Sequence, residues 1–446
     1  MSDSFDVTRY NIANEPTPVF QQLSAHYKKS YAFYTMSVRI PVILTNIIDR
    51  LNREKDEIVE KYGNLSREEL KQCIGEISKL KYEIQTNKQM TELPGNDSDQ
   101  FEWNKLLNEI APNDTYFTAV WLYAECYVYR KLRSIFEETQ SLKDFDHFEQ
   151  SKQLELSKSM DAISRVIKSV NEFNSVYRTA SEVGEFFCKL LKQDLWGNRN
   201  DLSITLGEEI KSIDCNPLQE IEKYNNDLLI DQTQDIWKCI SVEKEDKVVD
   251  IISDNSGFEL LSDLVLCDFI IHHKLAKKIR FRVKAIPWFI SDVLPKDFHY
   301  TLTELEKSQD PILKEAGLKW NGYVKSGQFE LIEPADHFFT SGYEFYKMEK
   351  ISPSLYQSIA ESHLAIFKGD LNYRKLLGDV NWDPTNDFRT ALNQFEPTNL
   401  CTLRTIKADL VCGLKAGQFE ELWEKDERWM STGQYGVIQF ISKRTN

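Results

Sequence analysis

The feature that most constrains the fold is the alternation of short apolar runs with helical patterns after Trp196. Val248–Ser253 (VVDIIS) and His363–Phe367 (HLAIF) are typical of buried strands, and each is followed by a helical pattern. Such alternation is typical of a parallel sheet whose crossover helices cover its faces. We therefore expect an α/β fold, namely an αβα sandwich on a largely parallel sheet.

The other expected elements of this half follow from the same periodicities. The strands are Arg280–Ala285 continued by Trp288–Ile290, Phe329–Ile332, Leu400–Thr405 and Gly436–Ile441. The helices are Gly257–His272, Lys296–Lys307, Pro311–Lys325, Ser352–Glu361 and Leu371–Leu377.

The first part of the chain has a different pattern, because its apolar residues recur at helical spacing. Ser66–Ile84, Tyr116–Glu138 and Leu154–Phe173 are the clearest examples, and the polar segment Asn87–Gln100 is expected to be a loop. Single cores rarely exceed about 300 residues, so a chain of 446 can hold two parts. We predict a helical region over 1–195 and an α/β catalytic domain over 196–446.

Composition narrows the partners and the compartment. With 55 basic and 70 acidic residues the net charge is −15, which argues against a nucleic-acid partner. Eight cysteines without a C-x-x-C pair predict reduced thiols. The polar N-terminus is no signal peptide, and Leu264–Ile271 is too short to span a bilayer. We expect a cytoplasmic monomer, also compatible with the nucleus, that binds no membrane.

Polar side chains follow four of the expected strands, where open α/β sheets bind ligands. Ser253–Gly257 (SDNSG) follows the first strand and Ser291–Val293 (SDV) the second. Lys368–Arg374 (KGDLNYR) follows His363–Phe367, and Arg404–Lys407 (RTIK) ends the strand near residue 400. These loops are expected to meet at one edge of the sheet.

The chemistry of these loops is complementary. Asp254, Asn255 and Asp292 are hard oxygen ligands for Mg²⁺, Mn²⁺ or a similar ion, and three ligands leave positions for water and substrate. The cations that suit a phosphate are Lys368, Arg374, Arg404 and Lys407. Gly257 and Gly369 permit close backbone approach. Such a set suits transfer of a phosphoryl group to water.

Taken one at a time, several of these residues also have a purely structural explanation. Asp254 and Asp292 are also typical helix N-caps, Lys407 a typical solvated lysine, and Arg374 a partner for Asp370 at i, i+4.

The motifs together resemble the metal-dependent damage-control phosphatase family. They are D-N-S-G-x-E-L at Asp254–Leu260, S-D-V, K-G-D-L-N-Y-R and R-T-x-K. The R-T-x-K element looks like the mark of its sugar-phosphate subfamily. Two further segments also resemble that subfamily, namely S-V-R-I-P-V-I-L at Ser37–Leu44 and L-W-G-N-R-N-D-L-S at Leu195–Ser203. The resemblance suggests that the chain is a fungal member.

The resemblance implies a metal-dependent hydrolase of fructose 1-phosphate, fructose 6-phosphate and related phosphomonoesters, active in metabolite damage control with Mn²⁺, Co²⁺, Ni²⁺ or Mg²⁺. Asp254, Asn255 and Asp292 would bind the metal, with the two aspartates catalytic. Substrate contacts would come from these three and from Lys368, Gly369, Asp370, Leu371, Asn372, Tyr373, Arg374, Arg404 and Lys407. Candidates for the pocket walls are Trp196, Asn198, Asp201 and Trp288.

Two other functions stay open at this point. An S-adenosylmethionine-dependent carboxyl methyltransferase activity has been ascribed to related proteins, although Asp-Asn-Ser-Gly is a poor cofactor turn and Glu259 fits a first helical turn. The second open alternative is a non-catalytic role, in which the helical half serves as an interaction platform. The chain has no P-loop, H-E-x-x-H or G-x-S-x-G motif, and no D-x-D at these strand ends. Whether Asp254 also acts as a nucleophile is left open.

Overall fold

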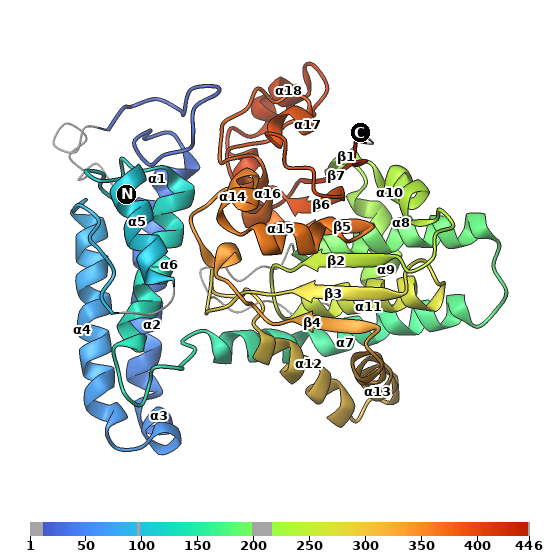
Figure 1. Cartoon of the computed structure of the whole chain (residues 1–446), viewed down its shortest axis with the longest axis horizontal. Coiled ribbons are helices and arrows are strands. Elements are labelled where there is room, and N and C mark those ends of the chain that lie inside the picture. The colour runs from blue at the N-terminus through green and yellow to red at the C-terminus, as the bar shows by residue number, and fades with distance from the viewer. Residues whose placement is uncertain (1–11, 96–98, 199–215, 445–446) are drawn as a thin grey trace.

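A seven-stranded sheet organises the second half of the chain (Figure 1), as the computed structural model shows for residues 12–95, 99–198 and 216–444. The strand order is β1-β7-β6-β5-β2-β3-β4, and all neighbours are parallel except β6 and β7. The strands are β1 Leu228–Asp231, β2 Val248–Ile252, β3 Lys278–Arg282, β4 Phe329–Ile332, β5 Leu364–Lys368, β6 Asn399–Thr405 and β7 Gly436–Ile441. The expected α/β class with a largely parallel sheet is confirmed.

Helices lie on both faces of this sheet and beside it (Figure 1). Those after residue 216 are α9 Pro217–Glu220, α10 Thr233–Ile240, α11 Phe258–His272, α12 Pro295–Lys307, α13 Pro311–Ser326, α14 Met348–Ile351, α15 Pro353–Ala360, α16 Gly369–Leu376, α17 Phe388–Ala391 and α18 Gln418–Lys425. The earlier ones are α1 Tyr31–Tyr34, α2 Ile40–Arg53, α3 Lys55–Tyr62, α4 Ser66–Gln85, α5 Gln100–Ile110, α6 Trp121–Glu137, α7 Glu149–Asn174 and α8 Ala180–Gly197. A single π-helical turn, Thr35–Arg39, joins α1 to α2.

The strand predicted at Trp288–Ile290 is wrong. This segment is a turn, in which Phe289 and Ile290 have φ angles of +40° and +73°. Such angles are incompatible with a strand. Trp288 and Ile290 are nevertheless buried in the core, so their apolar character reflects burial and not sheet pairing. The edge strand β1 was not predicted; three of its four residues are half buried and Asp231 is exposed.

Side chains of the central strands alternate between two cores. Val249 and Ile251 of β2 point into one cluster with α8, α11 and α12, whereas Ile252 points into the other. Leu364 and Ile366 of β5 alternate with their neighbours in the same way. This period of two, with apolar residues on both faces, is the pattern of a sheet covered on both sides.

Helices from both sides of residue 195 share one of these cores. Helices α7 and α8 pack against α11, and α8 also contacts β6. In Figure 1, α7 extends from the bundle of α2, α4 and α6 to the sheet. The division into 1–195 and 196–446 stays a prediction, although the packing of α7 and α8 brings the first part of the chain to the sheet.

The segment Tyr31–Arg53 is long and apolar enough to cross a membrane by length and composition alone, but 56% of its apolar window is buried in the protein. Ile43, Leu44 and Ile47 of this segment belong to the core. A buried core helix passes the same test of length and composition, so this segment is only weak evidence of a membrane span.

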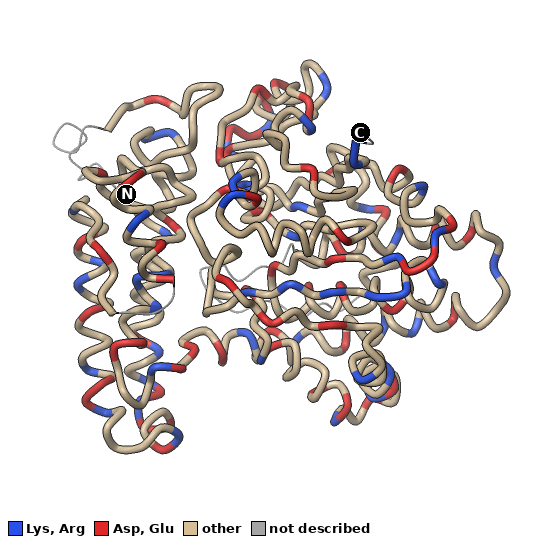
Figure 2. The backbone as a smooth tube through the Cα atoms, in the orientation of Figure 1, with Lys and Arg blue, Asp and Glu red and all other residues tan. Residues whose placement is uncertain are grey.

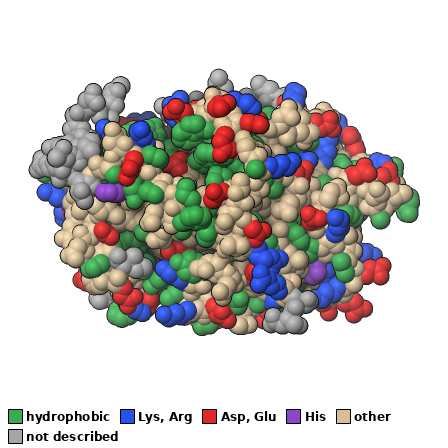
Figure 3. All heavy atoms as spheres, turned by 90° about the horizontal axis from the view of Figure 1, so that it is seen from above, with side chains coloured by type: hydrophobic (Ala, Val, Ile, Leu, Met, Phe, Trp, Pro, Cys, Tyr) green, Lys and Arg blue, Asp and Glu red, His purple; other side chains and the backbone are tan. Residues whose placement is uncertain are grey.

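The seven cysteines in the described ranges all carry free thiols, whereas Cys215 lies outside those ranges. Charges of both signs alternate along the chain in Figure 2, and the face in Figure 3 shows no extended basic surface among the described residues.

Candidate functional site

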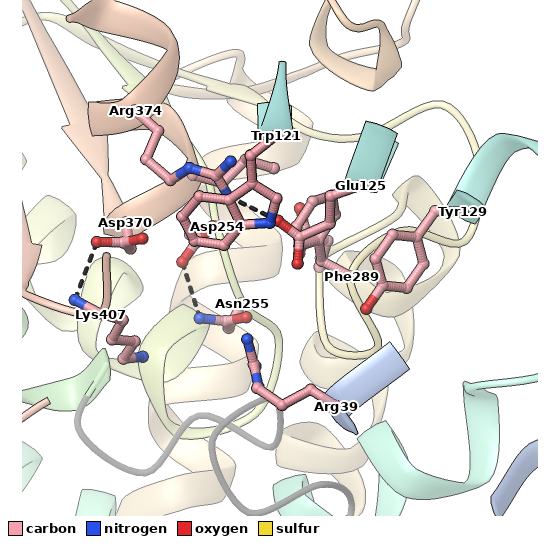
Figure 4. A pocket seen from close by; sticks show the side chains of 12 residues that line it. Arg39, Trp121, Glu125, Tyr129, Asp254, Asn255, Phe289, Asp370, Arg374 and Lys407 are labelled. Atoms are coloured by element: carbon pink, nitrogen blue, oxygen red, sulfur yellow. Dashed lines mark hydrogen bonds and ion pairs between the residues drawn. The ribbon is translucent and has the colours of Figure 1, made fainter. Parts of the chain in front are cut away.

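The strand ends meet at one cavity (Figure 4). Strands β6, β5, β2 and β3 are adjacent and parallel, so the loops that follow them lie at the same edge. The cavity measures about 50 Å³. It is lined by Arg39, Trp121, Glu125, Tyr129, Asp254, Asn255, Phe289, Asp292, Asp370, Leu371, Arg374 and Lys407. Seven of these twelve were predicted from the sequence.

Main-chain pairing joins the loops after β2 and β3. Asn255 and Asp292 form an isolated antiparallel bridge. The amide of Val293 donates to the carbonyl of Asp254 at 2.9 Å, and Ser291 Oγ donates to Asn255 Oδ1 at 2.6 Å. This pairing brings the three predicted metal ligands together, although 37 residues separate Asn255 from Asp292 in the sequence.

These three side chains have the right chemistry for a hard divalent cation. All three are at most 5% exposed, and they offer carboxylate and amide oxygens. Asp254 Oδ2 accepts hydrogen bonds from Asn198 Nδ2 and Asn255 Nδ2, each at 2.9 Å. Lys284 Nζ lies 2.7 Å from Asp292 Oδ2. Among the described residues no group of three or more His, Cys, Asp or Glu could hold a metal ion, so a cation here would depend on two carboxylates and an amide.

Gly369 lets the turn after β5 pass directly against Asp254. Its φ is +80°, and a Cβ built there would lie 1.8 Å from Asp254 Oδ2. A side chain would thus both strain the backbone and displace the carboxylate. This close approach explains a glycine between Lys368 and Asp370.

Asp370 is held in place by the R-T-x-K motif. Its Oδ1 accepts from Arg404 Nε at 2.7 Å and from the amide of Lys407 at 3.1 Å. Arg404 is fully buried, donates to the carbonyl of Leu410 at 2.7 Å and stacks on Tyr373. Arg404 therefore orients Asp370 from behind the cavity wall, whereas Lys407 lines the cavity.

Arg374 connects the site to helix α6. Its Nη1 donates to Glu125 Oε2 at 2.6 Å, its Nε donates to Asp379 Oδ1 at 2.8 Å, and its guanidinium lies 3.5 Å from the centre of the Trp121 ring. Burial alone would lower the pKa of Arg374, but Asp379 and Glu125 together raise it above its ordinary value. The guanidinium is therefore charged and fixed.

Lys368 lies behind the cavity in a buried cluster of charges. Its Nζ is 2.7 Å from both Asp194 Oδ1 and Asp263 Oδ1, and 3.5 Å from Glu259 Oε1. Burial alone would lower the pKa of Lys368, but attraction to these carboxylates raises it well above its ordinary value. Burial also raises the pKa of the Asp194 and Asp263 carboxyls.

The other predicted contacts also support the wall from behind. Asn372 Nδ2 donates to the carbonyl of Lys368 at 2.7 Å, and the Tyr373 hydroxyl donates to Gln439 Oε1 at 2.8 Å. Neither side chain lines the cavity, and neither do those of Lys368 and Arg404. Their assignment as substrate contacts stays a prediction.

Sequence reasoning missed the part of the cavity that the helical region supplies. Arg39, from the π-helical turn, lies opposite Asn255 in Figure 4, and Trp121, Glu125 and Tyr129 come from α6. The motif Ser37–Leu44 includes Arg39, so it was the sequence signal that could have identified this residue. Among the suggested walls, Asn198 contacts Asp254, Trp196 and Trp288 do not line the cavity, and Asp201 lies outside the described residues.

The fold and site define a class: α/β proteins with an acidic, oxygen-rich pocket and adjacent cations at the carboxyl ends of parallel strands. Residues 35–422 match the damage-control phosphatase ARMT1-like domain. The chain belongs to this family of metabolite-repair phosphatases, whose members are generally dependent on divalent metals.

Similar proteins cover nearly the whole chain. It is 38% identical over 439 residues to damage-control phosphatase ARMT1 of Mus musculus, covering 95% of this chain and 98% of the relative. Identity to ARMT1 of Danio rerio is 37% over 438 residues (95% and 97%), and to ARMT1 of Homo sapiens 36% over 436 residues (94% and 98%). These relatives are animal proteins, so the predicted fungal origin stays a prediction.

Proposed function

We propose that this phosphatase hydrolyses phosphomonoesters of sugars, including fructose 1-phosphate and fructose 6-phosphate, with a divalent metal, and that it belongs to the sugar-phosphate subfamily. One observation carries the proposal. One cavity is lined by the oxygen-bearing side chains Asp254, Asn255 and Asp292 together with Asp370 and Lys407. Oxygen ligands for a metal and a lysine around one cavity are the groups that a metal-assisted hydrolysis of a phosphate dianion requires.

Each group has a distinct role in this proposal. Asp254, Asn255 and Asp292 would hold Mn²⁺, Co²⁺, Ni²⁺ or Mg²⁺, and this ion would supply a water of lowered pKa and neutralise phosphate charge. Lys407 donates to the phosphate oxygens. A carboxylate oxygen of Asp254 or Asp292 takes the proton of the attacking water.

The sugar is oriented by two further carboxylates of the cavity. Asp370 and Glu125 accept hydrogen bonds from sugar hydroxyls, since both carboxylates line the cavity and are held by arginine side chains. The helical region thereby contributes to substrate choice.

The methyltransferase alternative is not favoured. Glu259, in the first turn of α11, accepts hydrogen bonds from Asn198 Nδ2 at 2.6 Å and Asn255 Nδ2 at 2.8 Å. It is therefore engaged in orienting amides behind the metal-ligand candidates. The similar proteins are named as phosphatases.

We further propose that the protein is a monomer of the cytoplasm, and also of the nucleus, without nucleic-acid or membrane partners. Seven free thiols support a reducing compartment. Light scattering of the purified protein tests the assembly, and microscopy of a tagged chain tests the location.

Phosphate release tests the proposed activity directly. The purified protein with Mn²⁺ should release phosphate from fructose 1-phosphate, lose this activity with a chelator and regain it on adding Mn²⁺. Asp254→Asn and Asp292→Asn should each lower turnover roughly 100-fold or more. Asp144→Asn, at an exposed carboxylate, is the matched control and should leave turnover unchanged. No release with any of the four metals would overturn the proposal.

A further inference from the structure

Asn198 is the last described residue before 199–215, and it lies at the C-cap of α8. Its main-chain N–H donates to the carbonyls of Leu195 and Trp196, which fixes the backbone. The residue is 2% exposed. Its side chain reaches the cavity wall between the loops after β2 and β6.

The side-chain amide of Asn198 uses its full hydrogen-bonding capacity. Nδ2 donates to Asp254 Oδ2 at 2.9 Å and to Glu259 Oε2 at 2.6 Å. Oδ1 accepts from Lys407 Nζ at 2.7 Å and from the hydroxyl of Thr405. Carboxylates only accept and an ammonium only donates, so this network permits one orientation of the amide.

The main chain of Asn198 adds a second contact to the same lysine. Its carbonyl accepts from Lys407 Nζ at 2.9 Å, so one residue gives the ammonium two acceptors. Lys407 has a flexible four-carbon stem, and these acceptors set the position of its charge.

We infer that Asn198 is a positioning residue that couples the metal ligand Asp254 to the phosphate-binding Lys407. Its amide separates a carboxylate from an ammonium and holds each at a fixed place in the cavity wall. The inference rests on the proposed function for the identity of the two ligands. Metal binding and phosphate binding then depend on one shared, buried amide.

Side chains that orient metal ligands typically contribute 10- to 100-fold, roughly, to metal affinity or activity. We therefore expect Asn198→Ala to weaken Mn²⁺ binding about 10-fold, measured by calorimetry without substrate. Asn399→Ala is the matched control, because its amide donates to the carbonyl of His363 at the opposite end of β6. That variant should bind Mn²⁺ like the parent protein.

A double-mutant cycle tests the link to Lys407. Lys407→Ala should lower kcat/KM roughly 100-fold in the parent protein but less than about 10-fold in Asn198→Ala, since the lysine is already misplaced there. Thr405→Val, which removes one bond to Asn198 and keeps the shape, should lower kcat/KM in the same direction by a smaller factor.

Equal effects of Lys407→Ala in both backgrounds, or unchanged Mn²⁺ affinity in Asn198→Ala, would overturn the inference. If Asn198→Ala does not fold, as thermal unfolding would reveal, Thr405→Val carries the test, and unchanged turnover then refutes the coupling. A parent protein that binds Mn²⁺ but releases no phosphate would instead contradict the proposed function, while the calorimetric comparison still decides the role of Asn198.

Discussion

Replacing Gly369 by alanine tests the close approach on which the site is built. The new Cβ would lie 1.8 Å from Asp254 Oδ2 and 2.3 Å from its Cγ. Heavy atoms in contact lie near 3.5 Å, so the carboxylate or the turn must move by more than about 1 Å. A displacement of this size costs roughly 100-fold in turnover. We expect Gly369→Ala to lower kcat at least that much and to weaken Mn²⁺ binding.

Gly327→Ala is a matched control for backbone strain. Gly327 has a φ of +76°, close to the +80° of Gly369, but no heavy atom lies within 4 Å of its Cβ position. Both variants lose about 1–2 kcal/mol of stability from the left-handed backbone. Urea unfolding measures this shared loss, and phosphate release with calorimetry measures the difference at Asp254. If the Gly369→Ala and Gly327→Ala variants had the same kcat, the proposed importance of the close contact between Gly369 and Asp254 would be refuted.

Two further predictions concern buried charge. Lys368→Met leaves three buried carboxylates without their ammonium, and urea unfolding should show a loss of roughly 3–5 kcal/mol. The exposed Lys71→Met should change stability little, and similar losses in both variants would contradict this reasoning. Burial lowers the pKa of His147 from 6.5 to about 3, so the unfolded chain binds a proton below pH 6.5 that the folded protein does not. Stability should therefore fall as pH falls, by roughly 2 kcal/mol at pH 5. His147→Phe, which keeps the stacking on Phe136, should flatten this slope in unfolding measured from pH 7 to 5, and an unchanged slope would speak against the assignment.

The central strands and the loops that follow them were predictable from the sequence. Strands β4 and β7 are short, mainly apolar segments, and their predicted ends agree with the structure. Because parallel strands carry their carboxyl ends to one edge, Asp254, Asn255 and Lys407 could be expected to meet. In a parallel sheet, the order of strands and loops in the sequence therefore indicates which loops lie together at one site.

The sequence pattern was misleading where burial and sheet pairing differ. Trp288–Ile290 has the composition of a strand, but its burial comes from packing in the core around a turn. The side chains of Lys368 and Arg404 have the chemistry of phosphate ligands, but they are fully buried among carboxylates and carbonyls. Composition does not tell which way a charged side chain points.

By itself, the sequence determined the class of fold, and it placed the oxygen-bearing side chains of Asp254, Asn255 and Asp292 at one edge of the sheet, because these follow from local periodicity and strand direction. Only the tertiary structure decided which residues from distant segments complete the cavity. Arg39 of the π-helical turn and Glu125 of α6 line it because these helical segments pack beside the sheet, and no local pattern encodes such long-range contacts. Packing depends on the shapes of whole surfaces, and these surfaces exist only once the chain has folded.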